Sequence, residues 1–269
     1  MPGETLKSLR TPVVTIGYPK ERTAPPAAFR GAPEIRLGGV FAALPSPEVC
    51  PTGAITLAPG TSRPRYTIDL ARCIFCGNCQ RQAAGGGVEI GHDFELAARR
   101  REDLLVQVES DRNGHVVAVP DTTEPLPPVA AEIQRVLGRS LNLRHLDAGS
   151  CNACDWELTA LLNPFYDVRR LGIDFVASPR HADGVIVTGA MTRNLELAAK
   201  RTYAAMPEPR IVIAVGACAS SGGIVGRSYA SAGGIADVLP VDVFIPGCPP
   251  RPEAILFGIL LAVGRIAAR

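Results

Sequence analysis

The C-terminal half of the chain alternates between short apolar runs and longer segments with helical spacing. Four runs rich in β-branched residues are expected to be strands, at 171–176, 184–189, 210–216 and 241–247. Helices are expected around 155–163, 191–206 and 251–268. Near-continuous apolar strands that alternate with helices are typical of a parallel sheet with helices on both faces. We therefore expect an α/β fold over residues 139–269.

The N-terminal half has a different pattern, with many turn residues and few long apolar runs. The runs 12–19 and 66–70 are each expected to form a short strand. Residues 109–128 are polar and then Pro-rich, which is typical of a linker. Residues 129–137 have helical spacing, and Gly138 would end that helix. The chain thus divides into a first domain at 1–110, a linker with a helix at 111–138, and a second domain at 139–269.

Composition limits the class of protein. The 269 residues are 46% hydrophobic, which suffices for one large or two modest domains. A net charge of +2 and 5% aromatic residues argue against a nucleic-acid-binding protein. The first 30 residues hold no apolar signal region, and no apolar run reaches the roughly 18 residues that span a bilayer. We expect a cytosolic protein, in which clustered cysteines are metal or redox sites rather than disulfides.

The eight cysteines form two sets of four, and the first set lies in the N-terminal half. The spacing Cys73-x2-Cys76-x2-Cys79 is the core of the bacterial ferredoxin run, which continues with three residues and a Cys-Pro pair. Here Ala83 stands at the fourth position, and the Cys-Pro pair is Cys50-Pro51. In two-cluster ferredoxins the Cys-Pro of one motif ligates the cluster of the other motif. The four residues Cys50, Cys73, Cys76 and Cys79 therefore make one complete ligand set for a [4Fe–4S] cluster.

The second set comes from three separate places in the C-terminal half. Cys151 and Cys154 follow a Gly-Ser turn, whereas Cys218 and Cys248 each follow the glycine-containing end of an apolar run. Ligands of parallel sheets bind at the carboxyl ends of the strands. Glycine lets the backbone turn closely past a bulky inorganic core. These four thiols are expected to hold a second [4Fe–4S] cluster.

Plainer interpretations exist for both sets. The first set could form a zinc knuckle from the same four thiols, or the thiols could be unligated core residues. Cys218 and Cys248, taken singly, could be small buried apolar residues, a common role of free cysteine. The four histidines, His92, His115, His145 and His181, have no metal-ligand spacing and are expected to be structural. The glycine pairs at 222–223 and 233–234 fit no phosphate-binding loop, so no nucleotide site is expected.

Around the first cysteine set, residues 12–110 resemble the ferredoxin-type subunit of formate hydrogenlyase and related complexes. That subunit is itself similar to the two-cluster ferredoxin subunit of respiratory complex I. The matching segments are 13–19, 29–33, 68–77 and 93–96. The resemblance implies a ferredoxin-like α+β domain. The chain departs from the pattern because the first cysteine cluster is missing, so one cluster is expected there rather than two.

Residues 139–269 resemble the small subunit of energy-converting (group 4) [NiFe]-hydrogenases and the homologous 20 kDa subunit of complex I. The matching segments are 147–157, 188–189, 215–219 and 245–253. The complex I subunit typically has adjacent cysteines at the first site, so Cys151-x2-Cys154 favours the hydrogenase side. The resemblance implies a flavodoxin-like sheet whose four cysteines hold the cluster next to the active site of a separate large subunit.

Glu157 matches a glutamate that lies near the subunit interface in this family. The resemblance makes Glu157 a candidate for proton transfer. The plain alternative is a polar residue on a helix face, or one that interacts with the dipole at a helix N-terminus.

The two cysteine sets predict a subunit with two [4Fe–4S] clusters, and the family resemblance implies an oxidoreductase subunit that relays electrons to or from a nickel–iron site on a partner. The partners implied are a hydrogenase large subunit and further complex subunits, including membrane subunits, with no nucleic acid. Such a chain would lie on the cytoplasmic face of the membrane, held there by those partners. Two alternatives are the same relay in a nickel-free, complex I-related quinone oxidoreductase or ion-pumping complex, and a free ferredoxin-like carrier or zinc module.

Overall fold

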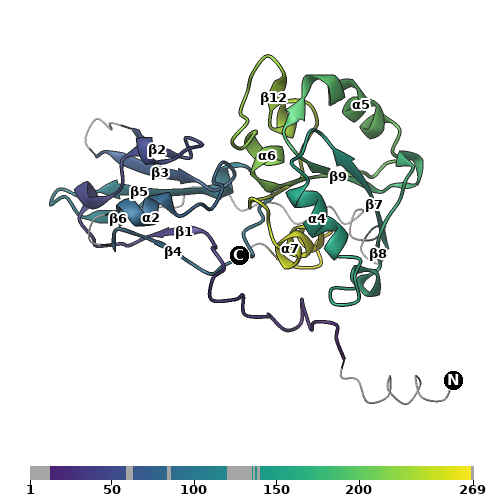
Figure 1. Ribbon diagram of the computed structural model, residues 1–269, viewed down its shortest axis with the longest axis horizontal. Coiled ribbons are helices and arrows are strands. Elements are labelled where there is room, and N and C mark those ends of the chain that lie inside the picture. The colour runs from purple at the N-terminus through teal and green to yellow at the C-terminus, as the bar shows by residue number, and fades with distance from the viewer. Residues whose placement is uncertain are drawn as a thin grey trace.

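The structure is a computed structural model, and it describes residues 13–58, 63–83, 86–119, 135, 137 and 140–267. Two sheets of different kinds lie side by side, an antiparallel one in the N-terminal half and a parallel one in the C-terminal half (Figure 1). Among the described residues, no helix is long and apolar enough to cross a membrane.

The C-terminal half is built on a five-stranded sheet in the order β13-β11-β9-β7-β8, and all neighbouring strands run parallel. The strands are β7 (Leu141–Asp147), β8 (Ile173–Phe175), β9 (Gly184–Thr188), β11 (Ile211–Val215) and β13 (Val243–Ile245). Every residue of the two central strands β9 and β11 is buried. The expected parallel sheet is therefore confirmed, and each of the four expected runs contains one of its strands.

Helices cover both faces of this sheet. The helices are α4 (Ala153–Ala160), α5 (Arg193–Ala204), α6 (Gly216–Ser221) and α7 (Pro252–Ala262). Side chains alternate across β11: Ile213 packs in one core with α4 and α7, and Val212 packs in the other with α5 and α6. Because all eleven residues of α7 are buried, this helix is enclosed by protein on all sides. Figure 1 shows α4 and α7 together on the near face.

The sequence pattern did not predict β7 and α6 of this half. The pattern does not predict β7, because its sequence LNLRHLD mixes polar with apolar residues although β9 and β8 flank it on both sides. The short helix α6 follows β11 directly, so Cys218 lies inside a helix rather than at a bare strand end. The C-terminal helix is also shorter than expected, since it begins at Pro252 and ends at Ala262.

The N-terminal half contains a four-stranded antiparallel sheet in the order β2-β3-β5-β6 and a separate two-stranded pair. Its strands are β1 (Pro33–Ile35), β2 (Ile55–Ala58), β3 (Arg65–Asp69), β4 (Val88–Ile90), β5 (Leu105–Ser110) and β6 (Val116–Ala118). β1 pairs with β4, and α2 (Asn78–Gln82) is the described α-helix of this half. The strand expected at 66–70 is thus confirmed as β3.

Three other predictions for this half were not confirmed by the structure. Residues 13–19 form no strand, so that prediction was wrong; Ile16 and Tyr18 pack instead in the core of the second half. β6 continues the antiparallel sheet past residue 110, where the sequence suggested a boundary. The helix expected at 129–137 lies outside the described residues, apart from positions 135 and 137.

Short remaining elements complete the chain. β10 (Met191–Thr192) pairs with β12 (Ser231–Gly233). Single 3-10 turns are η1 (Phe41–Ala43), η2 (Pro47–Val49), η4 (Glu102–Leu104), η5 (Val168–Leu171), η6 (Pro179–His181) and η7 (Ile235–Asp237).

The two halves share backbone and core contacts. Ala98 forms an antiparallel bridge with Phe244 on the free edge of β13. The Ile16 N–H donates to the Phe165 carbonyl at 2.9 Å. Ile16 and Ala97 belong to the same hydrophobic core as α7. The N-terminal half therefore pairs with the free edge of β13, the strand that leads into the Cys248 loop.

Candidate iron–sulfur sites

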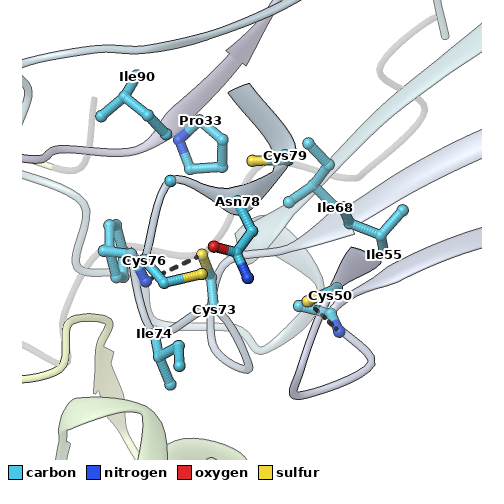
Figure 2. Close-up of a pocket in the computed structure, with 13 residues that line it drawn as sticks. Pro33, Cys50, Ile55, Ile68, Cys73, Ile74, Cys76, Asn78, Cys79 and Ile90 are labelled. Carbon is cyan, nitrogen blue, oxygen red and sulfur yellow. Dashed lines mark hydrogen bonds between the residues drawn. The ribbon is translucent and has the colours of Figure 1, made fainter. Parts of the chain in front are cut away.

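The first cysteine set lines a single pocket in the N-terminal half (Figure 2). Cys50 follows η2, Cys73 and Cys76 lie on the loop after β3, and Cys79 lies in the first turn of α2. Apolar side chains from β2, β3 and β4 close the pocket around the thiols: Ile55, Ile68 and Ile90. The fold therefore brings together the four residues that spacing alone had grouped, within an apolar shell.

Backbone groups are directed at these sulfurs. The Phe75 N–H donates to Cys73 Sγ at 3.3 Å, and the Ala54 N–H donates to Cys50 Sγ at 3.3 Å (Figure 2). Phe75 has a φ of +56° and Gly77 a φ of +74°, so the loop turns through left-handed conformations. Such conformations are costly for phenylalanine, and a strained loop of this kind is typical of a functional site. Hydrogen bonds to sulfur are one way in which proteins tune cluster potentials.

The acidity of the thiols differs within this set. Burial, with the neighbouring thiols adding to it, raises the pKa of Cys73 to about 12. Burial also raises the pKa of Cys79. Burial acts in the same direction on Cys50, but hydrogen bonds from the Thr52 hydroxyl and from nearby backbone N–H groups outweigh it and lower the pKa. Since a bound metal deprotonates its thiol ligands outright, a cationic cluster would remove the cost of holding these thiolates together.

The second set converges at the carboxyl end of the parallel sheet. Cys151 precedes α4 and Cys154 lies in its first turn, while Cys218 lies in α6 after β11 and Cys248 follows β13. Burial raises the pKa values of Cys154, Cys218 and Cys248. The second cause in each case is the charge of other thiols in the set, which raises the pKa further. This mutual effect means that the four thiols lie close enough to interact.

Gly216 has a specific steric role at this second set. Its φ is +85°, and a Cβ built there would lie 2.7 Å from Cys154 Sγ. Only glycine fits both the backbone conformation and the approach of the sulfur. Cys151 and Cys248 are exposed, so the second set opens at the surface of the chain, whereas the thiols of the first set are partly buried.

A hydrogen-bond network that the sequence did not reveal supports the Cys151–Cys154 turn. The Asp155 carboxylate accepts from the Thr188 hydroxyl at 2.6 Å and from the Ser150 hydroxyl, and His145 Nε2 lies 2.9 Å from Asp155 Oδ1. The Asp147 carboxylate accepts from the Ser150 N–H at 2.7 Å. His145 therefore has a partner next to the site. The sequence around His145, which mixes polar and apolar residues, gives no signal for this role.

Glu157 lies one turn after Cys154 on α4. Partial burial and the nearby charge of Glu253 raise the pKa of Glu157, and Arg251 opposes them. Glu253 is 1% exposed and pairs with Arg251, whose side chain is 17% exposed. The structure thus places the predicted Glu157 beside a buried ion pair, which the sequence did not predict.

The donor chemistry of both sets fits a cluster. All eight ligand candidates are thiols, the ligand type that holds [4Fe–4S] clusters, and each set contributes four. Across the described ranges, no group of three or more Cys, His, Asp or Glu residues is arranged to hold a metal ion. At the first set, the ferredoxin-type spacing of Cys73, Cys76 and Cys79 together with the Cys50-Pro51 pair favours a cluster over a zinc knuckle.

Comparison with known proteins identifies the class. The model of the family described as NADH ubiquinone oxidoreductase, 20 Kd subunit, matches residues 151–262, which include the whole second cysteine set. The chain is 46% identical over 137 residues to a protein of Pyrococcus furiosus named "Probable membrane-bound hydrogenase subunit", of which it covers 82%, using 51% of its own length. The chain therefore belongs to the NADH ubiquinone oxidoreductase 20 kDa subunit family.

Two further relatives carry related names. Formate hydrogenlyase subunit 7 of Escherichia coli is 43% identical over 155 residues, with 57% of this chain and 60% of the relative covered. An NADH-quinone oxidoreductase subunit of Citrifermentans bemidjiense is 48% identical over 114 residues, with 42% of this chain and 66% of the relative covered. The resemblance to hydrogenase and complex I subunits is thus confirmed for the C-terminal half, and the chain is a subunit of an oxidoreductase complex.

Among solved structures, similarity extends to the membrane-bound sulfane sulfur reductase, an archaeal respiratory membrane complex. The identity is 32%, the TM-score is 0.43, and the match covers 49% of this chain and 75% of the other.

Proposed function

We propose that this chain is the iron–sulfur electron-transfer subunit of a membrane-associated group 4 [NiFe]-hydrogenase complex of the formate hydrogenlyase type. The observation that carries the proposal is the arrangement of eight thiols as two separate sets of four, one in each half of a single chain. When bound, a [4Fe–4S] cluster accepts and releases single electrons. The chain's own residues would hold one such cluster at Cys50, Cys73, Cys76 and Cys79 and another at Cys151, Cys154, Cys218 and Cys248.

The two sites differ in a way that suits a relay. The first set lies in an apolar pocket of the N-terminal half, which we propose to be a ferredoxin-like domain. The second set has two exposed cysteines at the open end of the sheet. A large subunit that covers this end would exclude water from the second site and bring its own active site near. Two relatives are named as subunits of a membrane-bound hydrogenase and of formate hydrogenlyase, and these names together with the Cys151-x2-Cys154 spacing support a hydrogenase as that partner.

A second candidate is the same relay in a nickel-free complex related to respiratory complex I. The observation in its favour is the 48% identity to a subunit of an NADH-quinone oxidoreductase. The residues that distinguish the two candidates would lie on the large subunit. In both cases the chain would reach the cytoplasmic face of the membrane through partner subunits.

The test of the proposed endpoint is hydrogen-dependent dye reduction by the complex, purified anaerobically through a tag on this chain. We expect a large subunit and nickel to copurify, and we expect hydrogen to reduce a viologen dye. A complex without nickel that reduces a quinone but does not oxidise hydrogen would contradict the hydrogenase assignment and support the second candidate.

Substitution of Glu157 by glutamine should change the pH dependence of stability. The pKa of Glu157 is raised in the folded chain, chiefly by burial. The protonated Glu157 side chain therefore contributes to the free energy of unfolding at pH values below the pKa that glutamate has in the unfolded chain. This contribution is lost as the pH rises through the higher pKa of Glu157 in the folded chain. Glutamine resembles the protonated form, so the variant should match the parent at low pH and become relatively more stable at neutral pH. Anaerobic denaturant titrations at several pH values measure this difference.

A role of Glu157 in proton transfer predicts a second effect of the same substitution, on the activity of the complex. If Glu157 passes protons beside the second site, Glu157→Gln should also lower turnover of the complex and alter its pH profile. A variant with the expected stability profile but unchanged turnover at every pH would leave Glu157 with a structural role only.

A further inference from the structure

The last cysteine of the second set is held on both sides by residues of the N-terminal half. Before Cys248, Phe244 exchanges two backbone hydrogen bonds with Ala98, at 2.8 and 3.0 Å. After Cys248, the guanidinium of Arg251 lies over the rings of Phe29 and Phe94, with its Cζ 5.3 and 4.9 Å from their centroids. The Cys248 loop is therefore fixed by contacts across the boundary between the halves.

The Arg251 side chain has a defined orientation. Its Nε lies 2.8 Å from Glu253 Oε2 and its Nη2 lies 2.5 Å from Glu253 Oε1, which makes a two-point contact between guanidinium and carboxylate. Such a fork fixes the plane of the guanidinium and leaves its face free to stack on aromatic rings. Lysine cannot reproduce this arrangement, because its ammonium is a point charge without a plane.

A cavity of about 270 Å³ at this boundary is lined by residues of both cysteine loops. Its lining includes Ile74 and Phe75, which also line the pocket of the first set. It also includes Cys248 and Arg251. Since side chains do not fill this space, packing alone holds the loops less firmly there than in a close-packed core. Contacts such as those of Arg251 must supply the missing constraint.

We propose that Arg251 is a positioning residue that clamps the Cys248 loop to the N-terminal half and so sets the separation between the two cysteine sets. This inference rests on the proposed function, because the separation matters only if electrons pass between the sets. Near the loop before Cys73 there is an independent tie, since the Ser221 hydroxyl donates to the Ala71 carbonyl at 2.9 Å. That tie explains why loss of the clamp should loosen the boundary rather than separate the halves.

Two variants test the clamp in the complete complex. Arg251→Lys keeps a positive charge beside Glu253 but removes the fork and the stacking plane. Phe29→Leu keeps the whole ion pair and removes one of the two aromatic faces. The matched control is Arg210→Lys: Arg210 stacks on Tyr203 at 4.0 Å, pairs with Glu208 at 2.9 Å, and lies directly before β11, at the end of that strand remote from Cys218.

The readout is the magnetic interaction between the two reduced clusters, measured by electron paramagnetic resonance on samples of known iron content. We expect Arg251→Lys and Phe29→Leu to retain both clusters but to lose or broaden this distance-dependent interaction. Arg210→Lys should leave it unchanged. If both test variants carry the full iron content and show the same interaction as the parent, the positioning role of Arg251 is wrong, and the proposed electron-transfer function is unaffected. A parent chain without two clusters would instead overturn the proposed function, and the clamp with it.

Discussion

Replacement of Cys154 by serine is expected to abolish electron transfer through the complex while leaving the complex assembled. Cys154 is the thiol that α4 directs toward Gly216, and burial together with the charges of the other three thiols raises its pKa. Loss of residues that only support a ligand typically costs 10–100-fold in metal affinity or activity, so loss of a ligand should cost more than about 100-fold. Hydrogen-dependent dye reduction by the purified complex measures the effect.

A matched control for Cys154→Ser lies in the same turn. Asn152 has a φ of +67° and is exposed, and glycine adopts this conformation readily. Asn152→Gly should therefore retain activity and iron content. If Cys154→Ser retained the activity of the parent, the assignment of the second set as a required electron carrier would be wrong.

Replacement of Glu253 by glutamine is expected to give the largest loss of stability. The substitution leaves the Arg251 charge in a buried position without its carboxylate, and removal of one partner from a buried ion pair typically costs about 3–5 kcal/mol. Glu253 also lies in the first turn of α7, where a negative charge interacts favourably with the helix dipole. The free energy of unfolding of the cluster-loaded chain, from anaerobic denaturant titration, measures the loss.

The control for Glu253→Gln is an exposed ion pair. Arg36 and Glu89 lie 2.5 Å apart, but more than half of each side chain is exposed. Exposed pairs contribute little because water screens the charges, so Glu89→Gln should leave the unfolding free energy close to that of the parent. Equal effects of the two substitutions would mean that the Arg251–Glu253 pair is not buried in solution as the structure has it.

The sequence predicted the parts of this protein that are encoded by short-range spacing. The apolar runs of β9 and β11 are continuous because both strands are buried on both faces, so their pattern is visible without the fold. The ligand candidates were found in the same way, because cysteines three residues apart and cysteines after strand-ending glycines carry a local signal. Their grouping into two sets agrees with the shared pocket of the first set and the mutual charge effects within the second.

The missed features depend on contacts between residues distant in the chain. Within β7, the polar His145 is tolerated because Asp155 pairs with it, and the Asp183 carboxylate accepts from the backbone N–H of residue 142. Neither partner can be identified from the sequence of the strand. The stacking of Arg251 on Phe29 likewise requires the two halves to be in place. The boundary placed at residue 110 failed to include β6 because a three-residue strand gives too short a pattern to recognise.

The central claim is that this single chain holds two four-iron clusters. Native mass spectrometry of the chain, separated anaerobically from its complex, tests this claim most directly, because it counts iron and sulfide per chain. We predict a mass increase equal to two [4Fe–4S] clusters, which is about eight irons and eight sulfides. Double substitution of Cys73 and Cys76 should remove one cluster from that mass and leave the other. A parent chain that carries zinc without sulfide, a parent chain with only one cluster, or a double variant that keeps the mass of both clusters would contradict the account.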